Sequence, residues 1–161
     1  MGSLRVYPSA PQTFASYDRS TPLACNLFDP HLPSTCVNVH WDTTQHCLVA
    51  DRAQRVRFMV NLLWYHPGDG WFLGNLVMHN QLGTVGGMPG GEVAGEDLVV
   101  QQVSPPVNVS SPPASVELDL QPGDKVWAVP CAIQAPPATL TQAMATNGNV
   151  TVNYVEVEEI G

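Results

Sequence analysis

The residues best placed to bind a metal lie in the span H-W-D-T-T-Q-H, where His40 and His46 flank Asp42. Imidazole and carboxylate groups are common ligands of zinc and related ions. The spacing is loose for a metal site, and polar residues at a strand edge are the simpler interpretation. The other three histidines are scattered along the chain: His31, His66 and His79. A metalloenzyme of the cupin type needs His and Glu residues clustered on neighbouring strands, and the sequence does not supply this pattern.

Motifs for nucleophilic or phosphate chemistry are also missing from the sequence. It contains no G-x-S-x-G and no H-E-x-x-H. The glycine-rich stretch Gly83–Gly95 has no lysine and leads into no predicted helix, so it is no phosphate cradle. We therefore predict a protein that is not an enzyme and has no cofactor.

The four cysteines do not form a C-x-x-C motif, so neither a zinc knuckle nor a thioredoxin-like pair is indicated. They are Cys25, Cys36, Cys47 and Cys131. Two interpretations remain open. The cysteines are small buried apolar residues, or one disulfide joins two of them, and the sequence does not select the pair.

The composition predicts one all-β domain that spans residues 1–161. Charged residues make up 12% of the chain, against about 25% in an average soluble domain. Glycine and proline are frequent, at 13 and 15 residues. A chain of this length can bury a sizeable core without metals or disulfides.

The charge balance argues against nucleic-acid and membrane partners. The net charge is −8, and the cations are Lys125 and five arginines, with a basic cluster only at Arg52–Arg57. Phosphate neutralisation is therefore weak, and a polybasic membrane patch is absent. We expect no signal peptide and no transmembrane helix, because the chain starts without an apolar segment and no apolar run reaches about 18 residues.

Alternating apolar and polar residues predict eight to ten strands and no helix. Val116–Val129 reads as a strand, a turn and a second strand, in a hairpin or a tight corner, with Gly123 and Asp124 as the structural turn. Arg55–His66 and Trp71–Asn80 are predicted as the two strands of one long hairpin.

The remaining segments are predicted as loops and shorter strands. Gln81–Gly95 is a surface loop, and the residues we expect to contact a partner there are Gln81, Val85, Met88 and Glu92. Leu98–Val103 is a short strand, and Cys131–Asn149 is a long polar connection. Val150–Ile160 closes the chain as a strand, which needs a bulge to bury the apolar residues of both its sides.

Several of these segments recur in a fixed order in a known family. They are Arg5-Val6-Tyr7, the Arg55–Trp64 strand, the Pro67–Gly70 turn, the Trp71–Asn80 return strand, Leu118–Trp127 and the closing strand Val150–Ile160. In this order they resemble the C1q/TNF-like jelly roll, especially its bacteriophage and bacterial branch.

The resemblance implies a two-sheet antiparallel jelly roll that forms a compact homotrimer. The longest strand agrees, because it carries large apolar residues on both faces, more than one core needs: Met59, Leu63 and Tyr65 opposite Phe58 and Trp64. The alternative is that both faces pack within one core or under loops. The residues expected at the trimer interface are Tyr7, Phe58, Trp127 and Tyr154.

The resemblance also raises the question of calcium, which some family members hold through carboxylates near the trimer axis. The acidic residues that would serve are Glu92, Glu96, Asp97, Glu156, Glu158 and Glu159. A solvated acidic face is the simpler interpretation, and we predict no metal.

We predict a non-enzymatic virion structural protein, a trimeric decoration (cement) protein on the capsid exterior of a phage. Its partners are then two further copies of itself and the major capsid protein or another virion protein. The alternative is a receptor-binding head at a tail or fibre tip, which binds a host glycan or protein through exposed loops such as Gln81–Gly95.

Overall fold

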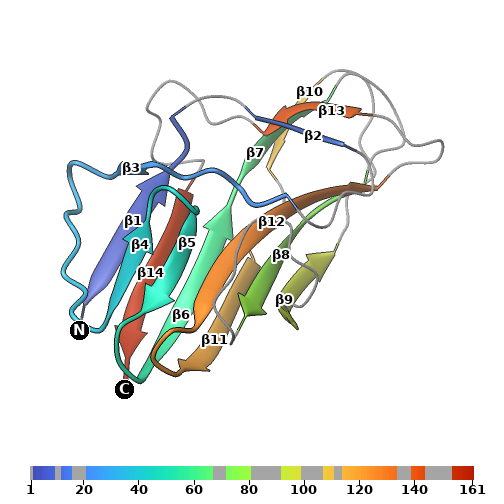
Figure 1. Cartoon of the computed structure of the whole chain (residues 1–161). Helices are drawn as coiled ribbons and strands as arrows, with labels where there is room; N and C mark the ends of the chain where they lie inside the picture. Colours follow the sequence, from blue (N-terminus) through green and yellow to red (C-terminus); the bar gives the residue numbers. More distant parts are fainter. Residues whose placement is uncertain are drawn as a thin grey trace.

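The computed structural model describes residues 2–9, 12–15, 21–66, 72–80, 92–98, 107–110, 114–133, 139–143 and 154–161. Fourteen β-strands and no helix occur in these ranges (Figure 1). The strands form two five-stranded sheets, which we call A and C, and a four-stranded sheet, B. All the described pairings are antiparallel.

Sheet A contains both the first and the last strand of the chain. Its strands in spatial order are β11 (Ala114–Leu120), β6 (Gln54–Asn61), β14 (Tyr154–Ile160), β1 (Ser3–Tyr7) and β3 (Leu27–Phe28). Alternate residues of β6, β14 and β1 are buried, as expected for strands with one face on a core. The predicted strands at both chain ends are thus present.

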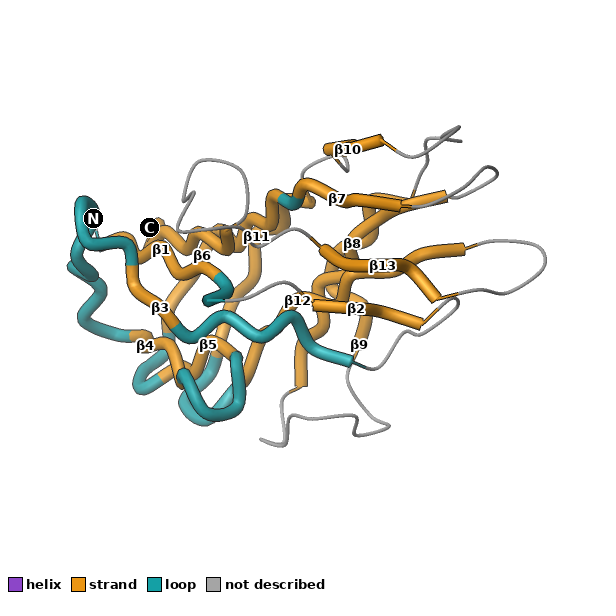
Figure 2. Tube along the Cα trace, turned by 90° about the horizontal axis from the view of Figure 1, so that it is seen from above, coloured by secondary structure: helices purple, strands orange, loops and turns teal. Residues whose placement is uncertain are grey.

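Sheet C is the opposite layer of the sandwich. Its strands in spatial order are β4 (Val39–Asp42), β5 (Cys47–Ala50), β12 (Lys125–Ile133), β8 (Phe72–Asn80) and β9 (Glu92–Leu98). Figure 2, seen from above, separates the layer of β1, β6 and β11 from that of β4, β5 and β12. The predicted all-β fold with two antiparallel sheets is therefore present.

Sheet B was not predicted. It contains β10 (Val107–Ser110), β7 (Leu63–His66), β13 (Thr139–Ala143) and β2 (Gln12–Ala15). The segment Arg55–His66, predicted as one strand, divides at Leu62 between sheets A and B. Strand β13 lies in the stretch predicted as a polar connection.

The core fills the space between sheets A and C. Phe58 of β6 is fully buried, and its ring stacks on Trp41 of β4 with 6.4 Å between centroids. Valines and leucines from both sheets complete this cluster, among them Val56, Val126 and Val157. Burial of apolar surface of this kind is the main stabilising term of the fold.

Two predicted pairings need correction. The segments Arg55–His66 and Trp71–Asn80 do not form a hairpin, because β6 pairs with β11 and β14 whereas β8 pairs with β12 and β9. The strands of Val116–Val129 also lie in different sheets, so this unit is the tight corner and not the hairpin. In both places the chain crosses from one layer to the other, as in a jelly roll.

Two smaller expectations also change. Strand β9 begins at Glu92, inside the predicted loop Gln81–Gly95. Strand β14 pairs with β1 and β6 in a continuous register, so the described part of the last strand needs no bulge. Its buried face is that of Val155, Val157 and Glu159.

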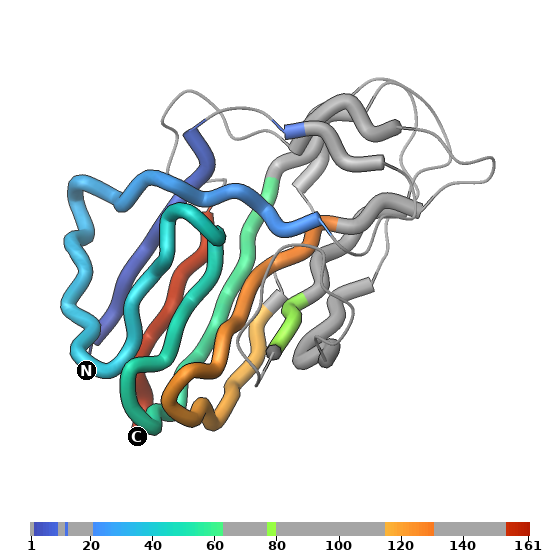
Figure 3. Tube along the Cα trace, viewed as in Figure 1, coloured from blue at the N-terminus to red at the C-terminus, as the bar shows by residue number. Residues whose placement is uncertain are grey.

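A long irregular segment encloses one edge of the sandwich. Residues 21–38 run past sheet C, turn at β3 and descend beside β1 to the N-terminus (Figure 3). The backbone N–H of Leu23 donates to Ala128 O of β12 at 2.8 Å, and that of Thr35 donates to Ser3 O at 2.8 Å. The segment is therefore tied to both sheets.

Candidate interaction face on the outer side of sheet A

The outer side of sheet A carries the largest group of charged residues with described contacts. Because every second residue of β1, β6, β11 and β14 points into the core, the intervening ones form this face. They are Ser3, Arg5, Tyr7, Arg55, Arg57, Met59, Asn61, Ser115, Glu117, Asp119, Tyr154, Glu156, Glu158 and Ile160. We call this set the outer face.

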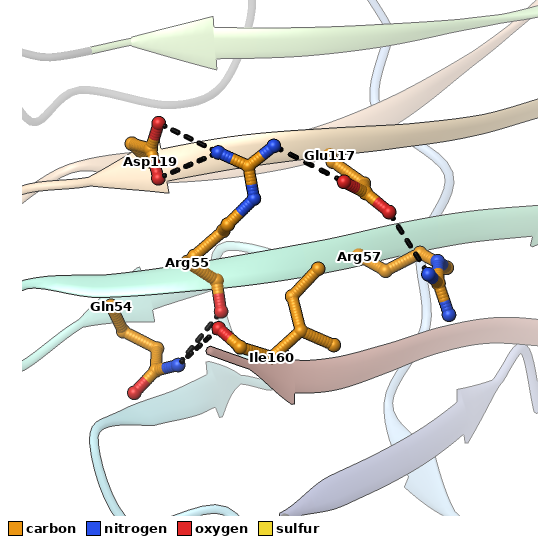
Figure 4. Close-up of polar contacts among 6 residues, drawn as sticks. All are labelled: Gln54, Arg55, Arg57, Glu117, Asp119 and Ile160. Carbon is orange, nitrogen blue, oxygen red and sulfur yellow. Dashed lines mark hydrogen bonds and ion pairs between the residues drawn. The ribbon is translucent and has the colours of Figure 1, made fainter.

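Five of these charged residues form a continuous ladder across three strands, and Figure 4 draws four of them: Arg55, Arg57, Glu117 and Asp119. Arg55 donates to both carboxylate oxygens of Asp119, at 3.1 and 2.9 Å, and its Nη2 donates to Glu117 at 3.1 Å. The other oxygen of Glu117 accepts from Arg57 at 2.9 Å, and Arg57 reaches Glu158 at 3.0 Å. Alternating charges thus link β11, β6 and β14 side by side.

The ladder shifts the pKa values of Glu117, Arg55 and Arg57 in the directions that pairing requires. Hydrogen bonds from Arg57 and then Arg55 lower the pKa of Glu117 below its ordinary value. Hydrogen bonds to Glu117 raise the pKa of both arginines, with Asp119 adding to the effect on Arg55. The side chains of the ladder are exposed to water, which keeps each ion pair weak.

Arg5 forms a second charged group on the same face. Its Nη2 donates to Glu156 at 2.9 Å, and its guanidinium carbon lies 4.4 Å from the ring centroid of Tyr154, a cation–π contact. Its Nη1 lies 4.0 Å from the buried carboxylate of Asp29. The Nε of Arg5 is buried and has no hydrogen-bond partner among the described residues.

The outer face is close to neutral although the chain is acidic. It holds three of the six cationic residues, opposite four carboxylates, whereas the whole chain carries −8. Two copies of an acidic protein repel each other, and this repulsion is smallest where charges are already neutralised. The face is therefore suited to contact with a second copy of the chain.

The four residues expected at a trimer interface divide into two pairs. Tyr7 and Tyr154 lie on the outer face and are partly exposed. Phe58 is 0% exposed and Trp127 is 3% exposed, so neither can meet another chain, and these two predictions are wrong. Phe58 points inward with Val56 and Val60, and Trp127 packs with Cys47 and Val129 in a small cluster on sheet C.

The corner between β11 and β12 is built around Gly123 and Asp124. Gly123 has a φ of 91°, which favours glycine, and its N–H donates to Ala50 O at 2.8 Å. The buried Asp124 carboxylate accepts from the backbone of Gln121 at 3.0 Å and lies 3.0 Å from Nε2 of His79. The pairing with His79 was not predicted, because 45 residues separate the two in the chain.

The proposed partner-contact loop lies mostly outside the described residues. This applies to Gln81, Val85 and Met88, and Glu92 is the first residue of β9, with its side chain not described.

His40, Asp42 and His46 do not converge on a metal site. His40 pairs with Asp51 at 2.8 Å, and Asp42 caps its own turn by accepting from Thr44 and Gln45. His46 faces the backbone carbonyl of Cys25 at 3.2 Å. In the part of the chain that is described, no three His, Cys, Asp or Glu residues form a metal-binding group.

The three candidate calcium ligands whose side chains are described do not come together either. Glu156 and Glu158 pair with Arg5 and Arg57 on the outer face. Glu159 points into the protein, is 5% exposed, and accepts from the backbone N–H groups of Val37 and Asn38 at 3.0 and 2.7 Å. The side chains of Glu92, Glu96 and Asp97 lie outside the description.

Three of the four cysteines are free thiols, and the side chain of Cys131 is not described. Cys25 and Cys47 are buried, and Cys36 is half-buried. Burial raises the pKa of Cys36 to about 11 and that of Cys47 to about 12, and raises that of Cys25 further. Cys25, Cys36 and Cys47 are thus small core residues and do not pair with one another.

A shallow cleft of about 400 Å³ lies at the end of sheet A, beside the ladder. Its lining residues are Ala53, Gln54, Arg55, Asp119, Leu120, Gln121 and Gly161. Three of its polar side chains already have partners within the chain, since Arg55 binds Asp119 and the Gln54 amide donates to Arg55 O and Ile160 O (Figure 4). The cleft therefore shows no group arranged for catalysis.

Comparison with solved structures matches 86 chains. One of them is the structure of Eiger TNF from S. frugiperda, which is 9% identical to this chain and superposes with a TM-score of 0.66. The match covers 99% of this chain and 91% of that chain, so the fold is a TNF-like jelly roll. No protein-family model matches the sequence, and no curated protein matches it.

Proposed function

We propose that this chain is a non-enzymatic structural subunit that assembles as a homotrimer through the outer face of sheet A and decorates the surface of a virion. The observation that carries the proposal is the outer face itself. Its charges neutralise one another within the chain, and its remaining side chains include the partly exposed Tyr7, Met59 and Tyr154.

A trimer accounts for the mixed chemistry of this face. In a ring of three copies, one patch of each copy meets a different patch of the next, so the contact is heterologous. Interface cores are depleted in charged residues and enriched in aromatic residues, Met and Arg. The outer face supplies Tyr7, Met59, Tyr154 and three arginines, with its charges paired within the chain, and TNF-like folds are consistent with trimers.

The proposed location on a virion is supported by the ordered sequence motifs, which resemble the phage branch of the jelly-roll family. A decoration protein needs a rigid subunit and several simultaneous contacts, and three copies supply them because multivalent attachment strengthens weak single contacts. The described part of the chain contains no helix that could cross a membrane.

The trimer is tested by the substitution Met59→Glu at the middle of the outer face. Native mass spectrometry of the unaltered chain should give three times the 17.4 kDa chain mass. The substitution adds one carboxylate per copy next to Glu156, with which Met59 is in register, and should shift the population to single chains. Thr43→Glu, at an exposed turn position, is the control and should remain trimeric. Equal trimer populations for both variants would exclude the outer face as the interface.

The location is tested by electron microscopy of the source virion, with the protein labelled by a bound antibody fragment. Label over the capsid exterior supports decoration. Label confined to the tail or fibre tip supports the receptor-binding alternative. Particles that carry no label would refute a virion role.

A further inference from the structure

The exposed large apolar side chains in the described part of the molecule all lie on one segment at the edge of sheet A. They are Leu27 at 39% exposure, Phe28 at 43%, Leu32 at 46% and Val37 at 77%. Figure 3 shows this segment, residues 27–38, as the blue trace that descends beside β1 to the N-terminus. We call it the apolar flank.

The apolar flank is continuous with the outer face. Leu27 lies opposite Tyr7 in the register of β3 and β1, so the two side chains point to the same side of sheet A. Because β3 is the last strand of the sheet, the rest of the flank passes around the sheet edge beside β1 (Figure 3). The outer face and the flank are therefore two adjacent sides of the subunit that share one border.

Hydrogen bonds fix the flank relative to the outer face. The N–H of Asp29 donates to Arg5 O at 3.0 Å, and that of Thr35 donates to Ser3 O at 2.8 Å. At the end of the flank, the buried Glu159 carboxylate of β14 accepts from its last two backbone N–H groups at 3.0 and 2.7 Å. Since β1 and β14 also carry the outer face, the fold sets the angle between the two surfaces, which lowers the ordering cost of binding.

Neither surface carries the charge that would repel a second copy of this acidic chain. Among residues 27–38, Asp29 is the only Asp, Glu, Lys or Arg, and it is 2% exposed and lies near Arg5. The outer face holds three arginines against four carboxylates. A contact between the flank of one copy and the outer face of the next therefore joins two surfaces of low net charge.

A ring of identical copies requires two different patches on each copy, because every contact is head-to-tail. Patches on opposite sides of a subunit would add copies without turning them, which gives an open filament. Patches on adjacent sides turn each copy relative to the last, so that a small ring can close. The outer face supplies one patch, and the flank is the adjacent side on which the exposed apolar residues lie.

We infer that the apolar flank is the second half of the contact between copies and packs against the outer face of the next copy in the ring. This inference rests on the proposed function, because it needs the trimer formed through the outer face. Leu32 and Val37 are the anchors of the flank. On the neighbouring outer face they cover partly exposed side chains such as Met59 and Tyr154, whose thioether and ring suit an apolar contact.

The first test compares the assembly of Leu32→Glu and Val37→Glu with that of the unaltered chain, by native mass spectrometry over a dilution series. Each substitution puts a carboxylate on the flank and removes only an apolar side chain. Thr43→Glu adds the same charge at an exposed turn position and is the control. Melting temperatures verify that each variant is folded. We expect the flank variants to need at least about tenfold higher concentration to assemble, as for loss of an interface anchor, and the control to assemble normally.

The second test finds where the flank binds, in a chain that keeps a large apolar group at the anchor. The photoreactive residue benzoylphenylalanine replaces Leu32, and this chain is mixed with isotope-labelled unaltered copies, assembled and irradiated. Peptide mapping then identifies the residues that are crosslinked to position 32. We expect crosslinks to the outer-face strands β6 or β14 of a labelled copy.

The outcomes separate the inference from the proposed function. Flank variants that assemble as well as the unaltered chain would overturn the flank as half of the contact and leave the proposed function intact. Crosslinks confined to one copy, or directed to sheet C of another, would have the same meaning. An unaltered chain that remains single would overturn the trimer, and with it the proposed function itself.

Discussion

Replacement of Glu159 by alanine should destabilise the fold far more than any change to its neighbour Glu158. The Glu159 carboxylate is 5% exposed and accepts two backbone hydrogen bonds, from Val37 and Asn38. A hydrogen bond to a charged group contributes about 1.5–3 kcal/mol, and here the bonds are partly shielded from water. We therefore expect Glu159→Ala to cost about 2–4 kcal/mol.

The cost can be read as a change in thermal stability. For a domain of this size, 1 kcal/mol corresponds to about 2–4 °C in melting temperature, so Glu159→Ala should melt about 10 °C earlier. Glu159→Gln keeps one acceptor oxygen and should lose less. Urea unfolding followed by tryptophan fluorescence gives the free energy directly.

Glu158 provides a matched control for the stability of the single chain, because it is adjacent in sequence but lies on the outer face and, among the described residues, forms only the ion pair with Arg57. Exposed ion pairs contribute about 0–1 kcal/mol, so Glu158→Gln should be close to neutral. A loss below about 1 kcal/mol for Glu159→Ala, within the range of surface substitutions, would refute the role of Glu159 as a buried anchor.

Three further predictions follow from the ladder, the corner and the thiols. The pKa of Glu117 is lowered in the folded chain, so its pairing stabilises the fold above the ordinary glutamate pKa and is lost as pH falls through the lowered value; Glu117→Gln should therefore lower the stability at neutral and alkaline pH, leave the most acidic end unchanged, and so flatten the acid side of a stability-against-pH curve. Gly123→Ala should cost about 1 kcal/mol of stability, because alanine is strained at a positive φ. A Cβ at this position meets no atom within 4 Å, so no steric clash adds to this cost. A neutral result in thermal melts would contradict the turn geometry. Native-state alkylation followed by peptide mapping should modify Cys36 slowly and Cys47 hardly at all, since burial raises both pKa values; rapid labelling of Cys47 would contradict its burial.

The alternation of residue types was sufficient to predict most strands of the sandwich but not their partners. Arg55–His66 and Trp71–Asn80 have the pattern of a hairpin, with a strong turn between them. The pattern says which face of each strand is buried and nothing about which sheet receives it. In this jelly roll the first segment passes from sheet A to sheet B at Leu62, and the second segment lies in sheet C.

The strand pattern indicates the burial of two side chains, Phe58 and Glu159, that were not predicted to be buried. Phe58 shares its side of β6 with Val56 and Val60, so it belongs to the core, although the resemblance suggested an interface. Glu159 shares its side of β14 with Val155 and Val157. A carboxylate on the apolar side of a strand is a signal of a buried anchor, since burying it without partners is costly.

The ladder on the outer face depends on cross-strand register, which the sequence alone does not give. Arg57 lies opposite both Glu117 and Glu158 only because β6 sits between β11 and β14. The same register places Tyr154 over Arg5 from the opposite end of the chain. Each of these contacts joins residues that are at least 60 positions apart in the chain.

Sedimentation equilibrium of the unaltered chain over a dilution series in the micromolar range tests the assembly through the outer face most directly. A mass of three times 17.4 kDa at every concentration is the expected result. A mass of 17.4 kDa throughout the series would contradict the trimer and leave the neutral outer face without its proposed role.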